Sequence, residues 1–250
     1  WTSIMLALSD FISFTIAMYI AMVVVRVFIE NGDELVRDAH VNDWLVFHIC
    51  LGLCCVAWYS IRLRHYFYRK TFWFELKEIL RTLVIFAVIE IAVMAFSNWY
   101  FSRYIWSLTW VFVLFLVPSC RMLTKKALNL MGLWRRETVI IGSGNNAFEA
   151  WRAIDSEKNL GFRVISFISS NSKEIKASNV DNIPVVEVRP TELIDKFDKR
   201  TQFIVALESH ESTLRNDWLR VFMINGYRYV SVIPTLRGMP LDSTDMSFIF

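Results

Sequence analysis

The first half of the chain consists of long apolar runs separated by short polar segments. A helix that crosses a membrane needs about 20 mostly apolar residues. Four runs are long enough, and they lie at residues 1–28, 44–61, 79–96 and 104–123. The pattern therefore predicts a bundle of four transmembrane helices over residues 1–124.

The pattern changes after residue 136, where short β-branched strands alternate with amphipathic helices. Strands are expected at residues 137–141, 163–169, 184–188, 202–207 and 229–233, and helices at 146–155, from Pro190, and at 211–225. Strands that alternate with helices at this spacing predict a parallel, doubly wound sheet. The expected fold class is a membrane α-helical bundle followed by a Rossmann-like α/β domain over residues 137–236.

Two further segments are interpreted as linkers, a basic amphipathic one at residues 125–136 and a second at residues 237–250. The chain starts without Met inside an apolar run and stops at Phe250 within a plausible strand. We therefore expect a piece of a longer polypeptide.

Composition supports this division and argues against a nucleic-acid partner and against a disulfide or metal site. Hydrophobic residues make up 55% of the chain and are concentrated in its first half, whereas the net charge is only +3, so no nucleic-acid partner is expected. The cysteines all fall in apolar segments without CxxC spacing, which favours buried thiols over disulfides or metal ligands. They are Cys50, Cys54, Cys55 and Cys120.

The distribution of Lys and Arg predicts the orientation. Residues 62–81 carry six of these cations and residues 121–136 carry five, whereas residues 30–43 and 97–103 carry one each. Because cytoplasmic loops are enriched in Lys and Arg, both chain ends and the α/β domain are expected in the cytoplasm.

Two basic segments, residues 65–78 and 125–134, also contain many large apolar side chains. Such segments lie along an anionic inner leaflet. They act either as a cradle for a lipid phosphate or as ordinary membrane anchors.

Apart from Arg81 and Arg121, which are counted with the basic segments above, four ionisable residues interrupt the apolar runs: Asp10, Arg26, His48 and Glu90. Charges in a membrane are costly and often functional. Glu90 lies near a segment centre, where it would serve a lipid or helix-pairing role or be a protonated carboxyl group bonded between helices. Four isolated charges do not form a transport pathway, so a transporter is not favoured.

A glycine-containing turn follows the first predicted strand. Turns of this kind aim backbone N–H groups and a helix N-terminus at a phosphate. The candidate nucleotide or phosphate site comprises Gly142, Ser143, Gly144 and Asn145. The alternative is that the glycines only permit close packing of the strand on the helix.

The residues that end the second predicted strand argue against a dehydrogenase. NAD binding normally requires an acidic residue there to hold the ribose hydroxyls, but this chain has Ser169 and Ser170. His210, a single histidine in a loop, is interpreted as solvated. The sequence shows no catalytic constellation and no metal-ligand spacing.

The order of these features resembles the long bacterial polyprenyl-phosphate phosphoglycosyl transferases. The resemblance rests on residues 138–144 (TVIIGSG), 160–168 (LGFRVISFI), 183–186 (IPVV) and 232–234 (VIP), with Gly238 after them. Ser169 and Ser170 depart from the family, whose second strand usually ends in acidic residues.

The resemblance implies transfer of a sugar 1-phosphate, with galactose as the sugar, from a UDP-sugar to undecaprenyl phosphate. UMP would be released, and the reaction would initiate O-antigen, lipopolysaccharide or capsule assembly. It also implies an Asp–Glu pair with magnesium in a C-terminal catalytic domain, toward which residues 237–250 would lead. No catalytic residue is assigned within this chain, which would be the accessory membrane and regulatory or dimerisation part.

Two other functions remain open from the sequence. One is a non-catalytic membrane sensor that reads a nucleotide, and the other is a membrane-bound sugar-nucleotide dehydratase. A homodimer is expected because two-fold dimers are the commonest assemblies. Exposed edge strands, with Trp218 and Tyr227 near the surface, are the expected contact features.

Overall fold

The computed structural model describes residues 1–38, 41–96, 102–157, 160–169, 183–192, 196–233 and 247–248. The chain divides into two compact units, Trp1–Leu133 and Trp134–Phe250. Each unit is described by itself below.

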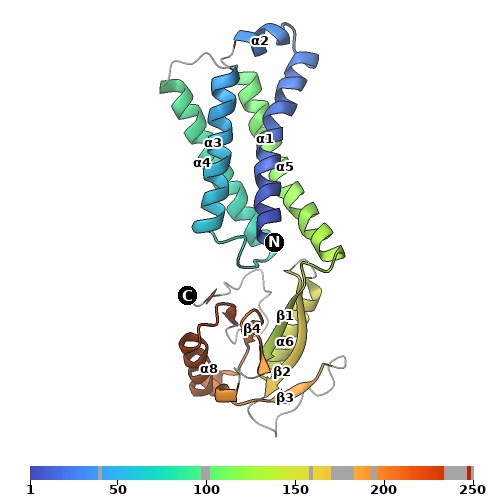
Figure 1. The fold of residues 1–250 in the computed structure, drawn as a ribbon, viewed down its shortest axis with the longest axis vertical. Helices are drawn as coiled ribbons and strands as arrows, with labels where there is room; N and C mark the ends of the chain where they lie inside the picture. The colour runs from blue at the N-terminus through green and yellow to red at the C-terminus, as the bar shows by residue number, and fades with distance from the viewer. Residues whose placement is uncertain are drawn as a thin grey trace. The chain divides into compact units, whose positions relative to one another are not determined.

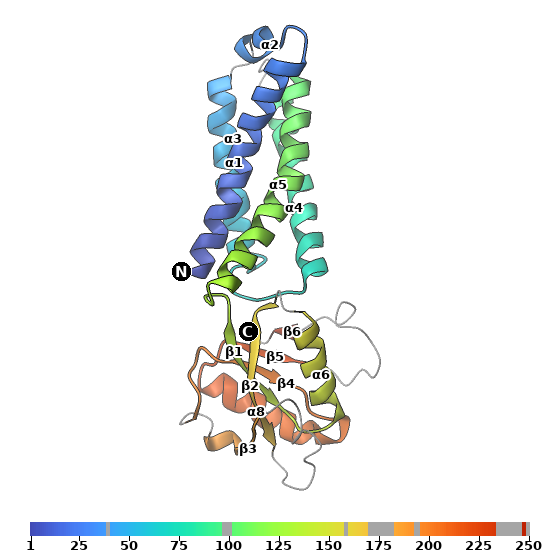
Figure 2. The same cartoon turned by 90° about the vertical axis from the view of Figure 1, so that its right-hand side faces the viewer.

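The first unit is a bundle of four long helices. They are α1 (Thr2–Phe28), α3 (Val41–Ile61), α4 (Phe72–Phe96) and α5 (Arg103–Leu130), and α1 lies between α3 and α5 (Figures 1 and 2). All four are long and apolar enough to cross a membrane, which confirms the prediction. A short helix, α2 (Gly32–Asp38), lies in the predicted loop after α1.

Two of these helices extend beyond the predicted apolar runs. Helix α4 begins at Phe72 rather than at residue 79, and α5 continues past residue 123 to Leu130. Part of each predicted basic segment is therefore helical. The added turns carry Glu75 and Lys125, good helix formers whose side chains form an ion pair with each other.

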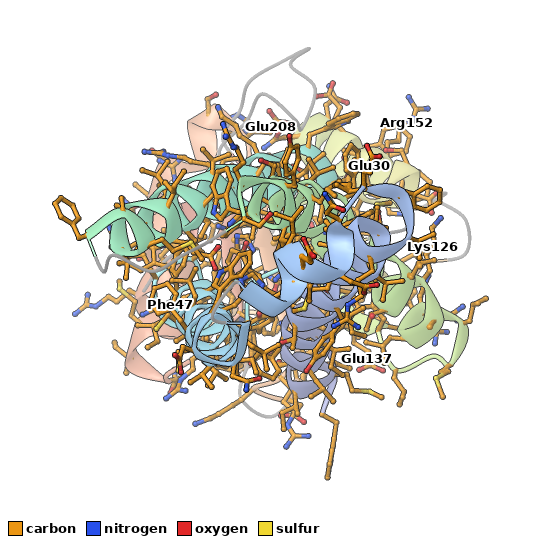
Figure 3. All side chains as sticks on the ribbon, turned by 90° about the horizontal axis from the view of Figure 1, so that it is seen from above. Glu30, Phe47, Lys126, Glu137, Arg152 and Glu208 are labelled. Carbon is orange, nitrogen blue, oxygen red and sulfur yellow. The ribbon has the colours of Figure 1, made fainter. Side chains whose placement is uncertain are left out.

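The bundle keeps many apolar side chains on its outer surface, as a helix bundle in lipid does. Figure 3, seen from the α2 end, shows side chains pointing outward from the helices as well as between them. Inside, α1 and α3 approach closely at Gly52, where an added Cβ would lie 2.9 Å from Phe14 Cδ1.

The second unit is built on a six-stranded sheet in the order β3-β2-β1-β4-β5-β6. The first five strands are parallel, which confirms the predicted sheet, and β6 pairs antiparallel with β5. Their bounds are β1 Arg136–Ile141, β2 Phe162–Ser169, β3 Val185–Glu187, β4 Gln202–Val205, β5 Val230–Val232 and β6 Ser247–Phe248. Strand β6 falls within the predicted linker at residues 237–250.

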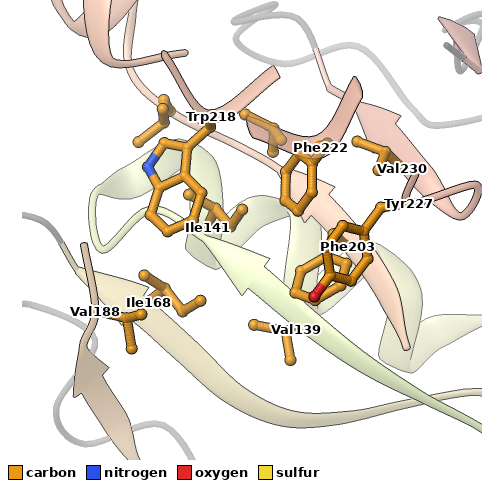
Figure 4. Packing of buried hydrophobic residues seen from close by; sticks show 11 residues of the cluster. Val139, Ile141, Ile168, Val188, Phe203, Trp218, Phe222, Tyr227 and Val230 are labelled. Carbon is orange, nitrogen blue, oxygen red and sulfur yellow. The ribbon is translucent and has the colours of Figure 1, made fainter. Parts of the chain in front are cut away.

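Helices cover both faces of this sheet, as expected for a doubly wound fold. Successive strand residues point to opposite faces, so Ile140 packs in the cluster of α6 (Asn145–Ser156). Ile141 packs with Trp218 of α8 (Ser212–Ile224) on the other face (Figures 2 and 4).

One expectation for this unit needs correction, and another lies partly outside the described residues. The helix expected from Pro190 starts as the 3₁₀ turn η3 (Pro190–Glu192), and Lys196 is again helical, but residues 193–195 lie outside the described part. Trp218 and Tyr227 are buried against Phe222 rather than exposed at the surface (Figure 4). They therefore offer no surface to a second subunit.

Candidate functional sites

The glycine turn lies against the segment that follows β4. Gly142 has a φ of +132°, and an added Cβ would lie 2.5 Å from the backbone oxygen of Ala206. At Gly144 an added Cβ would lie 2.7 Å from Oε1 of Glu208. Gly142 therefore requires glycine, because of its φ and because backbone atoms fill the space that a side chain would need. At Gly144 the space is filled by the side chain of Glu208.

Helix α6 receives a carboxylate from the chain itself at its N-terminus. The backbone N–H of Asn146 donates to Glu208 Oε1 at 3.0 Å, and its Nδ2 donates to the Leu207 carbonyl at 3.1 Å. The Ser143 hydroxyl lies 3.1 Å from the hydroxyl of Ser169, at the end of β2. The structure thus gathers three of the predicted residues at one sheet edge, while the fourth, Asn145, is exposed. Ligand binding by Gly142, Ser143, Gly144 and Asn145 stays a prediction.

Glu208 was missed at the sequence level, although two signals point to it. It follows a strand beside β1, and the carboxyl ends of parallel strands meet at one edge of a sheet. Glu211 lies three residues later, at the spacing of a capping box. The box is present: the Glu208 N–H donates to Glu211 Oε2 at 2.9 Å, and the Glu208 side chain accepts the backbone N–H of Glu211.

In the membrane bundle, Arg121 of α5 is the centre of one polar cluster and is only 2% exposed. Its Nε donates to Asp10 Oδ1 at 3.1 Å, and its Nη2 donates to the other oxygen of the same carboxylate. Its Nη1 donates to Glu75 Oε1 at 3.1 Å, and Lys125 donates to the other oxygen of Glu75. The Tyr66 hydroxyl completes the shell of Asp10 at 2.7 Å.

His65 joins this cluster as a neutral imidazole. Arginine only donates, so the 2.8 Å contact with Arg121 Nη1 requires His65 Nδ1 to accept. The opposite nitrogen, Nε2, then carries the proton and donates to Glu78 Oε2 at 2.6 Å. Burial is the main cause that lowers the pKa of His65, and the nearby Arg121 adds to it. Lys70 also donates to Glu78 at 2.6 Å.

This cluster is balanced in charge because it combines three cations with three carboxylates. A protonated His65 would break the balance and direct a second N–H at the guanidinium group. The six charged side chains are Arg121, Lys125, Lys70, Asp10, Glu75 and Glu78.

A second cluster surrounds Glu90 of α4, which is completely buried. Trp44 Nε1 donates to Oε1 at 2.9 Å, and Trp110 Nε1 donates to Oε2. His48 Nδ1 lies 3.0 Å from Oε1, while its Nε2 lies 3.2 Å from the carbonyl oxygen of Phe14. Since both histidine nitrogens face acceptors, one proton must be held between His48 and Glu90. The cluster links side chains or backbone of all four helices.

Two expectations about these charges are corrected by the clusters. The charges within the apolar runs are not isolated, because Asp10 pairs with Arg121 and His48 with Glu90. Arg121, which the loop-charge count included among the cations that set orientation, is buried within the bundle. The helix-pairing interpretation of Glu90 fits this geometry.

The described part of the chain contains no group of three His, Cys, Asp or Glu side chains that could hold a metal ion. The magnesium implied by the resemblance stays an expectation for the C-terminal catalytic domain.

The fold defines the chain as a helical membrane bundle joined in sequence to a Rossmann-like unit. The chain belongs to the CoA-binding domain family, whose model matches residues 63–212.

Relatives extend along the whole chain. An uncharacterized sugar transferase of Haemophilus influenzae is 46% identical over 257 residues, covering 100% of this chain and 53% of the relative. A UDP-galactose-lipid carrier transferase of Erwinia amylovora is 44% identical, covering 98% of this chain and 51% of the relative. An undecaprenyl-phosphate galactose phosphotransferase of Salmonella typhimurium is 41% identical, covering 99% and 51%. These names confirm the predicted resemblance. The chain spans about half the length of each relative.

Proposed function

We propose that this chain is the membrane-embedded and α/β part of an enzyme that transfers galactose 1-phosphate from UDP-galactose to undecaprenyl phosphate. The observation that carries the proposal is the pair of relatives named for galactose transfer to a lipid carrier, which align with almost the whole chain at 44% and 41% identity. The substrates and the activity belong to the full-length protein.

Within that enzyme, the bundle keeps the protein in the bilayer where the lipid substrate resides. Its apolar outer surface and four candidate spans support this role. The catalytic residues, together with any magnesium that they bind, lie in a part of the protein outside this chain. The α/β unit serves as an accessory element for positioning, regulation or dimerisation.

The proposed location is the bacterial inner membrane, with both chain ends and the α/β unit in the cytoplasm. The Lys and Arg bias of residues 62–81 supports this orientation. A nucleotide sugar would then meet the lipid phosphate at the cytoplasmic surface. The lipid-linked product would begin the assembly of an O-antigen, lipopolysaccharide or capsule polysaccharide.

We also propose a homodimer, the commonest assembly of soluble homo-oligomers. Its contacts must come from surfaces other than Trp218 and Tyr227, since both are buried. Native mass spectrometry of the full-length protein from lipid nanodiscs is expected to give twice the monomer mass, and a monomer would contradict this proposal.

The activity is tested with the full-length protein in nanodiscs. UMP release is expected only when UDP-galactose and undecaprenyl phosphate are supplied together, and a chelator of divalent cations is expected to stop it. Omission of the lipid and replacement by UDP-glucose are the controls. Absence of UMP from every UDP-sugar, with the protein folded and the lipid present, would contradict the proposal.

A further inference from the structure

The carboxyl ends of β1 and β4 mark the place where an open α/β sheet normally holds its ligand. In the order β3-β2-β1-β4-β5 the chain builds outward in one direction from β1 and then in the other from β4. Ligands of such sheets bind in the crevice at this reversal, with phosphate groups at the helix that follows β1. That helix is α6 in this chain.

Here, groups of the chain itself bridge the reversal. The Glu208 carboxylate accepts the backbone N–H of Asn146 from α6 and the backbone N–H of Glu211 from the helical turn after β4. One anionic side chain thus caps two helical segments. A ligand phosphate would be bound in the same way, because its oxygen atoms would accept backbone N–H groups at a helix N-terminus.

On the other side of the crevice, groups of the chain itself also occupy the positions where a ligand would bind. The residue that would hold ribose hydroxyls at the end of the second strand is Ser169, whose hydroxyl is engaged with the Ser143 hydroxyl of the turn. Gly142 and Gly144 approach the backbone of Ala206 and the side chain of Glu208 respectively. The glycines therefore admit protein atoms where other folds of this type admit a coenzyme.

We infer that Glu208 is a built-in anion that takes the place of a ligand phosphate, so that this α/β unit is closed to nucleotides and coenzymes. A phosphate entering the crevice would meet a like charge and would have to displace a carboxylate that caps two helical segments. The unit then acts as a scaffold, and Glu208 is the residue that decides its binding specificity. This inference does not depend on sugar transfer.

The test uses hydrogen exchange of the 250-residue chain in nanodiscs, followed at the backbone amide of Asn146. In the wild-type chain, millimolar ADP, UDP, coenzyme A or pyrophosphate is expected to leave this exchange unchanged. The Glu208→Ser variant retains a side chain able to cap the turn after β4 but no longer reaches α6. Its Asn146 amide is expected to exchange at least tenfold faster, and pyrophosphate is expected to restore protection.

Two controls separate a local change from misfolding. Glu149→Gln removes the same charge from the exposed side of α6 and is expected to leave the Asn146 amide protected. Glu208→Gln keeps an acceptor oxygen but no charge, so its exchange should lie between those of the wild type and Glu208→Ser. Unchanged exchange of the backbone amides of β1 and β4 verifies that each variant has a folded core.

Protection of the wild-type Asn146 amide by any of the four ligands would overturn the inference. Unchanged exchange in folded Glu208→Ser, or failure of pyrophosphate to protect it, would also overturn it. None of these readouts measures UMP, so the outcome is independent of the proposed enzymatic function.

Discussion

Individual residues in the bundle show how buried charge is made tolerable. Arg121 lies within hydrogen-bond distance of Asp10, Glu75 and His65, and Glu90 accepts from two tryptophans. Such groups are retained in a membrane only when partners satisfy them. A substitution in these clusters should therefore destabilise the bundle mainly because it leaves another buried polar group without its partner.

Replacement of Arg121 by Gln is expected to destabilise the bundle strongly. The change leaves the Asp10 carboxylate without its cation, whereas Glu75 keeps Lys125. Removal of one partner of a buried ion pair typically costs about 3–5 kcal/mol. The free energy of unfolding in lipid, measured by steric trapping, checks this. Arg26→Gln is the matched control because Arg26 is exposed on α1. Equal effects of the two changes would contradict a central role for Arg121.

Stability of the bundle is also expected to fall as the pH decreases below about 7. The pKa of His65 is lowered from 6.5 in the folded protein, so the unfolded chain binds more protons in the range below 6.5. Stability therefore rises with pH through that window and is lost as the pH falls through it.

Thermal unfolding between pH 7.5 and pH 5.5 measures the effect of His65. Asn at position 65 can accept from Arg121 and donate to Glu78 without becoming protonated, so His65→Asn should make the pH dependence shallower. His210→Asn, at an exposed histidine, should leave it unchanged. An unaltered slope in His65→Asn would exclude His65 as the cause.

At the scale of elements, a small residue determines where two helices of the bundle pack closely. Helices α1 and α3 meet where Gly52 faces the ring of Phe14, and the same ring stacks on His48 with centroids 4.5 Å apart. In lipid, small residues allow helices to come together because apolar side chains gain little by leaving the lipid. Gly52 thus supports the geometry of the Glu90 cluster.

The variant Gly52→Leu is expected to destabilise the bundle by about 1–3 kcal/mol, the usual cost of overpacking. The added side chain must displace Phe14 and with it the stacked His48. Val46→Leu, on the exposed side of α3, adds bulk toward lipid and should have little effect. Unfolding in lipid compares the two variants, and a neutral Gly52→Leu would show that α1 and α3 do not approach this closely.

For the whole molecule, the orientation of the chain in the membrane remains a prediction from loop charges. Arg121 lies inside the bundle and Lys125 ion-pairs with Glu75, so the surface cations that support this orientation lie mainly in residues 62–81. The acidic segment that contains α2 would then face the outside.

Cysteine labelling measures this orientation directly. In a background without the native cysteines, Glu30→Cys is expected to react with a membrane-impermeant maleimide in intact spheroplasts. Asp217→Cys, on the exposed side of α8, is expected to react only after permeabilisation. The reverse pattern would place the α/β unit outside the cell and would contradict the proposed function.

The sequence by itself was sufficient for the four spans, the parallel sheet and the resemblance to sugar transferases. Hydropathy over a span and the alternation within a strand such as residues 137–141 are local properties, so they can be read without knowledge of distant contacts. The apolar runs underestimated the lengths of α4 and α5. The polar end turns of these helices pair with one another through Glu75 and Lys125, a contact between distant segments that hydropathy does not report.

Only the tertiary structure decided which charges are paired and what lies at the glycine turn. Asp10 and Arg121 are separated by 111 positions, and Asn146 and Glu208 by 62. Nothing in the local composition specifies such partners, because they are brought together by helix packing and by the order of strands in the sheet. Whether the α6 N-terminus faces solvent or a carboxylate therefore depended on the fold.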